Sequence, residues 1–134
     1  MGHGKVWLKK GEKLLCIIDW ERRYQLIKSH TVAHILSALI NKESGALITG
    51  NSITPEKTRI DLSLENCNQE IAKGYIKKTN DSIKKNTLVE TYEISLDELH
   101  KNPHMIKLAK GLPSHVKKVR IVKIGDIDEQ PDGG

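Results

Sequence analysis

The apolar residues of this chain change their spacing along the sequence, and this change limits the fold to a mixture of helices and strands. Helical spacing predicts one long helix over about residues 21–41 and a second over about residues 66–86. A capping pattern in residues 95–99 predicts a further, short helix. Two long helices and one short helix are therefore predicted.

Strand-like alternation of apolar and polar residues separates and follows these helices. The alternation covers residues 46–53, 58–64, 87–94 and 117–125. The proline-containing residues 54–57 suit a turn, so the first two strands should form an antiparallel hairpin. Residues 126–134 are polar and turn-rich and are expected to follow the last strand. The predicted fold class is α+β, a mainly antiparallel sheet with two long helices packed on it.

The composition fits one soluble domain. The chain has 134 residues, of which 37% are hydrophobic, and no apolar run approaches the ~20 residues of a membrane span, so we expect no membrane partner. Cys16 and Cys67 are too few for a disulfide framework, and we expect reduced thiols in a cytoplasmic protein. The net charge of +5 favours a polyanionic partner, and solvated lysine-rich surfaces are the alternative.

His30 and His34 lie four residues apart in the first predicted helix, so both imidazoles share one face and can point at a single metal ion. The same face carries Ile27 and Ala38, which makes two buried core histidines the alternative. The pattern is not the zinc-peptidase motif H-E-x-x-H, because Thr31 stands where that motif has its glutamate base. Spacing alone leaves the metal site and the core open.

The remaining histidines show no shared helix face. His100 and His104 have the same spacing, but Pro103 breaks the helix between them, so we expect two surface residues. His3 and His115 have no partner that the sequence reveals. None of these histidines is a predicted ligand.

A catalytic zinc ion usually has three protein ligands and a water. Asp132, in Q-P-D-G-G, is a candidate for the third ligand, because two glycines beside its carboxylate allow close approach of the backbone. The alternative for P-D-G-G is an ordinary turn.

Several motifs follow one another in a distinctive order. They are IDWERRYQLIKSHTVAHILSALI, TGNSI with RIDL, IKKTNDSIKKNTLVETYEI and VRIVKIGDIDEQPDGG. This order, from about residue 17 to residue 134, resembles the editing domain of alanyl-tRNA synthetases and of free-standing alanyl-tRNA editing proteins. The resemblance implies the α+β fold that the editing domains of threonyl- and alanyl-tRNA synthetases share.

The resemblance also implies a site and an activity. His30, His34 and Asp132 match the positions of Zn²⁺ ligands, and the Thr-His that completes the family's motif, with a fourth ligand, would lie beyond Gly134. The implied activity is ATP-independent hydrolysis, in trans, of alanine tRNA mischarged with serine or glycine. A second site of this kind is needed because a pocket for alanine discriminates poorly against either amino acid. Zinc can polarise the ester carbonyl, orient the substrate or activate water, and these roles stay open.

The T-G-N-S-I stretch is the predicted substrate contact. Thr49, Asn51 and Ser52 offer short donors and acceptors, and Gly50 lets a ligand approach the backbone. The alternative is a polar strand end. Thr31 is a further candidate for recognising the substrate hydroxyl, although a threonine in a helix can simply bond a backbone carbonyl.

Charged residues provide weaker candidates. Arg59 and Asp61 alternate on one strand, and we rank a role in substrate binding below a structural ion pair. The candidates for contacts to tRNA phosphates, with a solvated surface as the alternative, are Arg22, Arg23, Lys77, Lys78, Lys84 and Lys85.

The resemblance also divides the chain. Residues 1–19 are expected as a glycine-containing leader and the last strands of a preceding β-barrel domain, and residues 20–134 as the editing domain, so we expect a fragment trimmed at both ends. The alternatives for function are an editing domain of the threonyl-tRNA synthetase type, against which the D-G-G ending argues, and a non-catalytic tRNA-binding module. The sequence predicts no oligomeric state.

Overall fold

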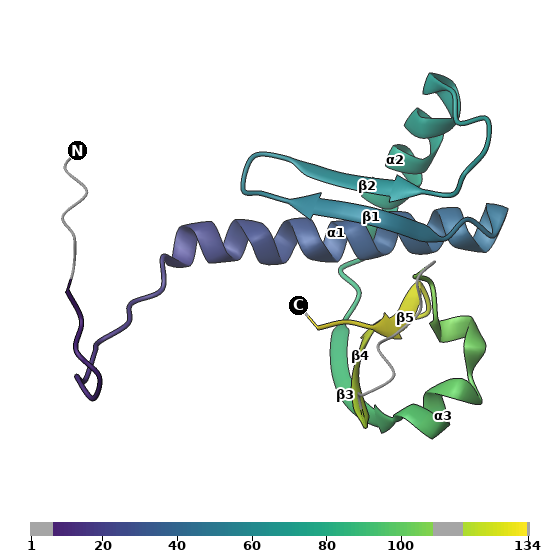
Figure 1. Cartoon of the computed structure of the whole chain (residues 1–134). Helices are drawn as coiled ribbons and strands as arrows, with labels where there is room; N and C mark the ends of the chain where they lie inside the picture. Colours follow the sequence, from purple (N-terminus) through teal and green to yellow (C-terminus); the bar gives the residue numbers. More distant parts are fainter. Residues whose placement is uncertain (1–6, 109–116, 134) are drawn as a thin grey trace.

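The computed structural model describes residues 7–108 and 117–133. A long central helix, α1, lies between a two-stranded hairpin and a three-stranded sheet, and a second helix, α2, packs beside α1 (Figure 1). The elements are α1 (Trp20–Ser44), β1 (Ile48–Ile53), β2 (Thr58–Leu62), α2 (Gln69–Lys84), β3 (Val89–Ser95), α3 (Leu96–His100), the 3-10 helix η1 (Pro103–Met105), β4 (Lys118–Ile124) and β5 (Asp128–Pro131). The predicted α+β class is confirmed.

Helix α1 has a well-defined cap at each end. The Asp19 carboxylate accepts a hydrogen bond from the backbone N–H of Arg22 at 3.1 Å, which satisfies a donor that the first turn leaves open. At the other end Gly45 adopts a left-handed conformation, with φ of 73°, and donates to the carbonyl of Asn41 at 2.8 Å. Helix α1 therefore forms close to the predicted range 21–41, and α2 forms close to the predicted range 66–86.

The two halves of α1 differ in burial. The second half packs inside the protein through buried residues that include Ile35, Ala38 and Ile40. In the first half Trp20 and Tyr24 are exposed, and in Figure 1 these first turns extend beyond both sheets. His30 and His34 lie where the helix passes from one environment to the other.

The strands form two separate antiparallel sheets in the described residues, the β1-β2 hairpin and a sheet of order β3-β4-β5. The core of the three-stranded sheet has two clusters. One joins α3 and η1 to β4 through Leu99, Met105 and Ile121. The other joins α1 to β4 through Ile35, Val122 and Ile124, so it fixes the sheet against the histidine-bearing part of α1.

Strand β5 corrects the expectation for the C-terminal segment. Residues 128–131 were expected in a polar, turn-rich tail, but they pair with β4 in the register Val122 to Gln130 and Ile124 to Asp128. Asp128 and Gln130 are both buried, so this strand turns polar side chains inward. Alternation of apolar residues cannot identify such a strand, because its buried face is not apolar.

The described part of the N-terminal segment, residues 7–19, contains a turn but no helix or strand. The strands expected there do not form in these residues, and the division of the chain at residue 19 stays a prediction. Cys16 and Cys67 are both exposed and free of a disulfide. None of the helices in the described ranges combines the length and the apolar content that a membrane crossing requires.

Candidate metal centre

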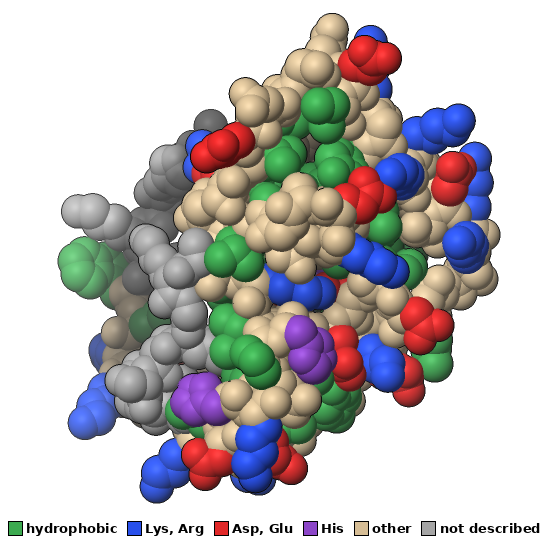
Figure 2. Space-filling model, turned by 90° about the vertical axis from the view of Figure 1, so that its right-hand side faces the viewer, with side chains coloured by type: hydrophobic (Ala, Val, Ile, Leu, Met, Phe, Trp, Pro, Cys, Tyr) green, Lys and Arg blue, Asp and Glu red, His purple; other side chains and the backbone are tan. Residues whose placement is uncertain are grey.

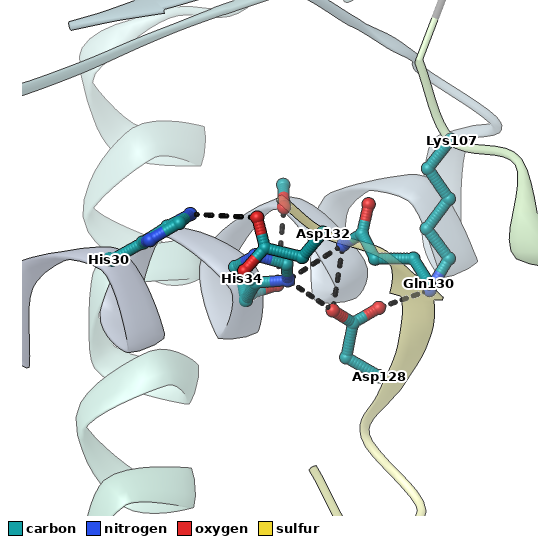
Figure 3. A network of polar contacts seen from close by, with 7 residues as sticks. His30, His34, Lys107, Asp128, Gln130 and Asp132 are labelled. Carbon is teal, nitrogen blue, oxygen red and sulfur yellow. Dashed lines mark hydrogen bonds and ion pairs between the residues drawn. The ribbon is translucent and has the colours of Figure 1, made fainter. Parts of the chain in front are cut away.

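Helix α1 and the segment after β5 bring three ligand groups together (Figure 3). His30 Nε2 lies 3.4 Å from Asp132 Oδ1, and His34 Nε2 lies 3.7 Å from Asp132 Oδ2. The two imidazole centroids are 5.0 Å apart, and one ligand atom from each of the three residues falls within 4.8 Å of the others. These are the residues that the sequence resemblance predicts as zinc ligands.

The spacing of these atoms suits a shared cation better than direct hydrogen bonds. N–H···O bonds have separations of roughly 2.7–3.2 Å, and the distances of 3.4 and 3.7 Å are longer. Tetrahedral zinc with bonds of about 2.0–2.2 Å holds its ligand atoms roughly 3.4 Å apart. Two imidazole nitrogens and a carboxylate oxygen are also a donor set that zinc accepts. The residues therefore form a possible His/His/Asp metal group.

The sequence left a metal site and a buried core as alternatives for the two histidines, and their burial contains elements of both. The His34 side chain is 11% exposed and lies against the core, whereas His30 is 34% exposed and Asp132 is 16% exposed. The centre is thus set into the wall of the protein, with His30 on its open side.

Asp132 is held in place by two hydrogen bonds with Arg120 of β4. Its N–H donates to the carbonyl of Arg120 at 3.0 Å, and Arg120 Nη1 donates to the carbonyl of Asp132 at 3.3 Å. The backbone bond continues the β4-β5 pairing by one residue, and the Arg120 side chain holds the Asp132 carbonyl in addition. The turn expected for P-D-G-G is therefore replaced at Asp132 by a strand-like extension.

A buried polar cluster lies behind His34. The Asp128 carboxylate is 2.9 Å from His34 Nδ1, accepts from Gln130 Nε2 at 2.7 Å and forms an ion pair with Lys107. The sequence interpretation missed these three residues. Asp128, Gln130 and Asp132 alternate along the strand, and a period-2 pattern of polar residues ending at a candidate ligand is the signal that could have identified two of them.

The charges in this cluster favour a cation. Burial would lower the pKa of His34, but the hydrogen bond with Asp128 and the negative charges of Asp128 and Asp132 outweigh it and raise this pKa to about 9. Burial likewise acts to raise the pKa of Asp128, yet its bonds from His34, Lys107 and Gln130 hold that pKa below the usual value. Without a metal, a proton on His34 supplies positive charge, and a bound cation would take its place.

A cavity of about 380 Å³ opens beside the three ligand groups. Its lining combines apolar residues of β1 and β2, such as Ile53 and Ile60, with the polar residues Asn51, Lys118 and Arg120. A second hollow, which shares His30, His34 and Asp132 with this cavity, is also lined by Arg23 and Thr31, among others. The three candidate ligand groups therefore line two hollows, each large enough for a small organic group.

The predicted substrate-contact residues of β1 differ in position. Asn51 lines the cavity, whereas Thr49 and Ser52 are exposed and do not line it. A Cβ atom on Gly50 would lie 2.8 Å from Asp61 Oδ2, but this oxygen ends an exposed side chain that can turn away, so the contact does not by itself require glycine there. Thr31 lines the second hollow, but its hydroxyl donates to the carbonyl of Ile27 at 3.1 Å. The roles predicted for these residues stay predictions.

The charged candidates lie apart from one another. Arg59 and Asp61 form an exposed ion pair at 3.2 Å, which is the structural role ranked first for them. Arg22 and Arg23 lie in the first turns of α1, and Arg23 reaches the second hollow. The four lysines predicted to meet phosphates lie in α2 or directly after it, and these are Lys77, Lys78, Lys84 and Lys85.

Acidic neighbours accompany several of these lysines. Lys78 pairs with Glu43 of α1, and Lys84 lies 3.8 Å from Asp81. On the face shown in Figure 2, Lys and Arg side chains are interspersed with Asp and Glu. His100 and His104 are exposed, as predicted, while His3 and His115 lie outside the described residues.

Comparisons with known proteins identify relatives over nearly the whole chain. No family model matches it. The alanyl-tRNA editing protein AlaX-M of Methanosarcina acetivorans is 37% identical over 134 residues, covering 99% of this chain and 55% of the relative. AlaX-M of Saccharolobus solfataricus is 39% identical over 127 residues, covering 95% and 53%. An alanine-tRNA ligase of Saccharolobus islandicus is 29% identical over 130 residues, covering 95% and 14%.

The matched region includes both His30 and His34 and the segment that carries Asp132, since the first of these alignments covers 99% of the chain. The chain spans about half the length of the AlaX-M relatives that it matches. It is therefore homologous to the AlaX-type alanyl-tRNA editing proteins and to a segment of alanine-tRNA ligases.

Proposed function

We propose that this chain provides the hydrolytic site of an editing enzyme that removes serine or glycine, in trans, from mischarged alanine tRNA. The observation that carries the proposal is the convergence of His30, His34 and Asp132 at the mouth of a cavity, within a chain homologous to proteins named for alanyl-tRNA editing. The proposed reaction is hydrolysis of the ester between the amino acid and the terminal ribose.

The metal proposed for the site is zinc, held by His30 Nε2, His34 Nε2 and the Asp132 carboxylate. A fourth coordination position would take water, substrate or the further ligand that the family's motif implies. When bound, zinc supplies a Lewis acid beside the ester carbonyl. The protein residues orient this site: α1 fixes the histidines, and hydrogen bonds with the backbone and side chain of Arg120 fix Asp132.

The cavity supports the proposed preference for a small aminoacyl group. Its volume of about 380 Å³ is at the small end of ligand pockets. Asn51 adds an amide that can bond a serine hydroxyl, whereas alanine would leave that amide without its partner. This discrimination is strong once the bound aminoacyl end of the tRNA covers Asn51, which is exposed in the free chain, because an amide left unpaired away from water is costly. Thr31, Thr49, Gly50 and Ser52 stay candidates for further contacts.

The proposed tRNA partner must approach from the open side of His30. Arg23 is the basic candidate that lines the second hollow together with His30, His34 and Asp132. The lysines of α2 are weaker candidates, because Lys78 and Lys84 already have acidic neighbours. We therefore place the phosphate contact at the start of α1 in preference to α2.

The test is hydrolysis of alanine tRNA charged with serine, with glycine and with alanine. It is made with the chain as it stands and with the chain extended by Thr-His after Gly134. We expect zinc-dependent release of serine or glycine, with alanine retained, and loss of this activity in His30→Ala. The matched control is His100→Ala, which removes an exposed histidine of α3.

Absence of hydrolysis from both zinc-loaded forms, with tRNA binding retained, would support a binding module in place of an enzyme. Release of serine from threonine tRNA, with alanine tRNA untouched, would assign the threonyl-tRNA synthetase type of editing. Zinc that stays bound in His30→Ala would contradict the ligand set.

A further inference from the structure

Asp128 is the most deeply buried charged group of the site. Its side chain is 0% exposed, although an ionised carboxylate is costly to remove from water. Three polar side chains from three parts of the fold compensate this burial, namely His34 of α1, Lys107 after η1 and Gln130 of β5 (Figure 3). The Asp128 carboxylate, with three side-chain partners, thus lies directly behind His34, a candidate metal ligand.

Donor and acceptor chemistry assigns the proton on His34. An ionised carboxylate only accepts hydrogen bonds, so the contact of 2.9 Å requires a hydrogen on His34 Nδ1. Gln130 Nε2 donates to the same oxygen, and its distance of 3.1 Å to His34 Nδ1 is what two donors sharing one acceptor produce. A bare Nδ1 would instead direct its lone pair at the Asp128 oxygen.

The assignment leaves the other ring nitrogen for the metal. With Nδ1 as the donor, the neutral imidazole has its lone pair on Nε2, which faces Asp132 Oδ2 at 3.7 Å. A metal-ligating histidine almost always donates its second N–H to a carboxylate, a carbonyl or water, and this bond fixes the ring orientation and raises ligand basicity. The His30 ring contacts Asp132 through Nε2 at 3.4 Å and the His34 ring at 5.0 Å between centroids.

We infer that Asp128 is a positioning residue, which holds the His34 imidazole with Nδ1 as donor so that Nε2 is presented to the metal. Lys107 balances the charge of Asp128, and Gln130 fixes the shared oxygen from β5. The backbone around Lys107 is anchored in turn, because its carbonyl accepts from the N–H of Ile48 at 2.9 Å. The inference deepens the proposed function and rests on it for the identity of the bound ion.

The first arm of the test uses the wild-type chain without metal. Two-dimensional ¹H–¹⁵N spectra at alkaline pH, where the ring is neutral, report which nitrogen of His34 carries hydrogen. We expect the Nδ1–H form. An Nε2–H form overturns the inference, and this arm is independent of whether any variant folds.

The second arm compares metal binding by Asp128→Asn and Asp126→Asn. Asparagine keeps the shape and one acceptor oxygen but removes the charge, whereas Asp126 is an exposed aspartate of the adjoining turn and serves as the matched control. We expect cobalt(II), the spectroscopic probe, to bind about 10- to 100-fold more weakly to Asp128→Asn, with a shifted visible absorption spectrum. Asp126→Asn should match the wild type.

Unchanged cobalt affinity and an unchanged spectrum in folded Asp128→Asn would overturn the inference. Failure of the wild type to bind cobalt or zinc would instead contradict the proposed metal site. The ¹⁵N arm, made without metal, still decides the positioning role of Asp128 in that event. The two failures are therefore distinguishable.

Discussion

The two ring nitrogens of His34 have different surroundings. Nδ1 lies 2.9 Å from Asp128 Oδ2, and Nε2 lies 3.7 Å from Asp132 Oδ2. One nitrogen is thus held by the interior of the protein, and the other faces the cavity. This division explains how a histidine can be nearly buried and still serve as a ligand.

The raised pKa of His34 predicts how the stability of the metal-free protein depends on pH. The pKa is about 9 in the folded chain against the ordinary histidine value of 6.5, so protonated His34 stabilises the fold fully below pH 6.5. This contribution is lost as the pH rises through 9. The free energy of unfolding of the wild type, minus that of His34→Gln, should therefore decrease over this interval in urea titrations. If this difference in the free energy of unfolding stays constant with pH, the raised pKa of His34 is contradicted.

Loss of Lys107 should destabilise the protein strongly. Lys107→Met leaves the buried Asp128 without its cation, and breaking a buried pair costs about 3–5 kcal/mol. The matched control is Lys123→Met, which breaks the partly exposed pair with Glu129 at 3.9 Å and should cost about 0–1 kcal/mol. Unfolding in urea measures both values, and equal costs would argue against a charged Asp128 in the core.

At the scale of elements, the site depends on a strand that is polar on its buried side. The long helices and the hairpin were predictable because their apolar residues follow one period, as Ile35 and Ala38 do in α1. Strand β5 was not, because Asp128 and Gln130 fill the positions where a core strand has apolar residues. Lys107 follows η1 outside any regular element, so no periodicity could connect it with β5.

The turn into β5 provides a test at this scale. Gly125 has a φ of 46°, and a Cβ there would lie 2.4 Å from the Thr87 methyl group. Gly45 has a φ of 73° with no atom within 4 Å of such a Cβ. Gly45→Ala should therefore cost about 1–2 kcal/mol from backbone strain alone, and Gly125→Ala should cost more.

Thr87→Ser, which removes the methyl group, should recover the excess cost in the Gly125→Ala background. The measurement is the free energy of unfolding of the two single variants and the double variant. Equal destabilisation by both glycine substitutions would show that the contact with Thr87 is relieved without cost.

At the scale of the whole molecule, α1 connects the hairpin on one side with the three-stranded sheet on the other. The ligand groups come from both ends of the described chain, with His30 and His34 in α1 and Asp132 after β5. The order of the motifs indicated a resemblance to alanyl-tRNA editing domains, and the chain is homologous to AlaX-M proteins. The folded chain adds that the three groups meet. Local periodicity cannot predict a contact between residues that lie this far apart in the sequence.

A metal that joins these distant segments should stabilise the whole fold. Zinc at 100 times its dissociation constant stabilises a folded protein by about 2.7 kcal/mol when the unfolded chain does not bind it. We expect thermal unfolding of the wild type to shift upward with zinc, and His30→Ala to lose the shift. His104→Ala, at an exposed position in η1, should keep it. A zinc-dependent shift in His30→Ala as large as in the wild type would place the ion elsewhere.

The zinc K-edge X-ray absorption spectrum of the loaded chain tests the central claim most directly, because it reports the ligands of the ion itself. We predict nitrogen and oxygen neighbours at about 2.0–2.2 Å, with the outer scattering of imidazole rings that His34→Gln reduces. Sulfur neighbours at about 2.3 Å, which Cys16 or Cys67 would supply, or an absence of imidazole scattering, would contradict the centre formed by His30, His34 and Asp132.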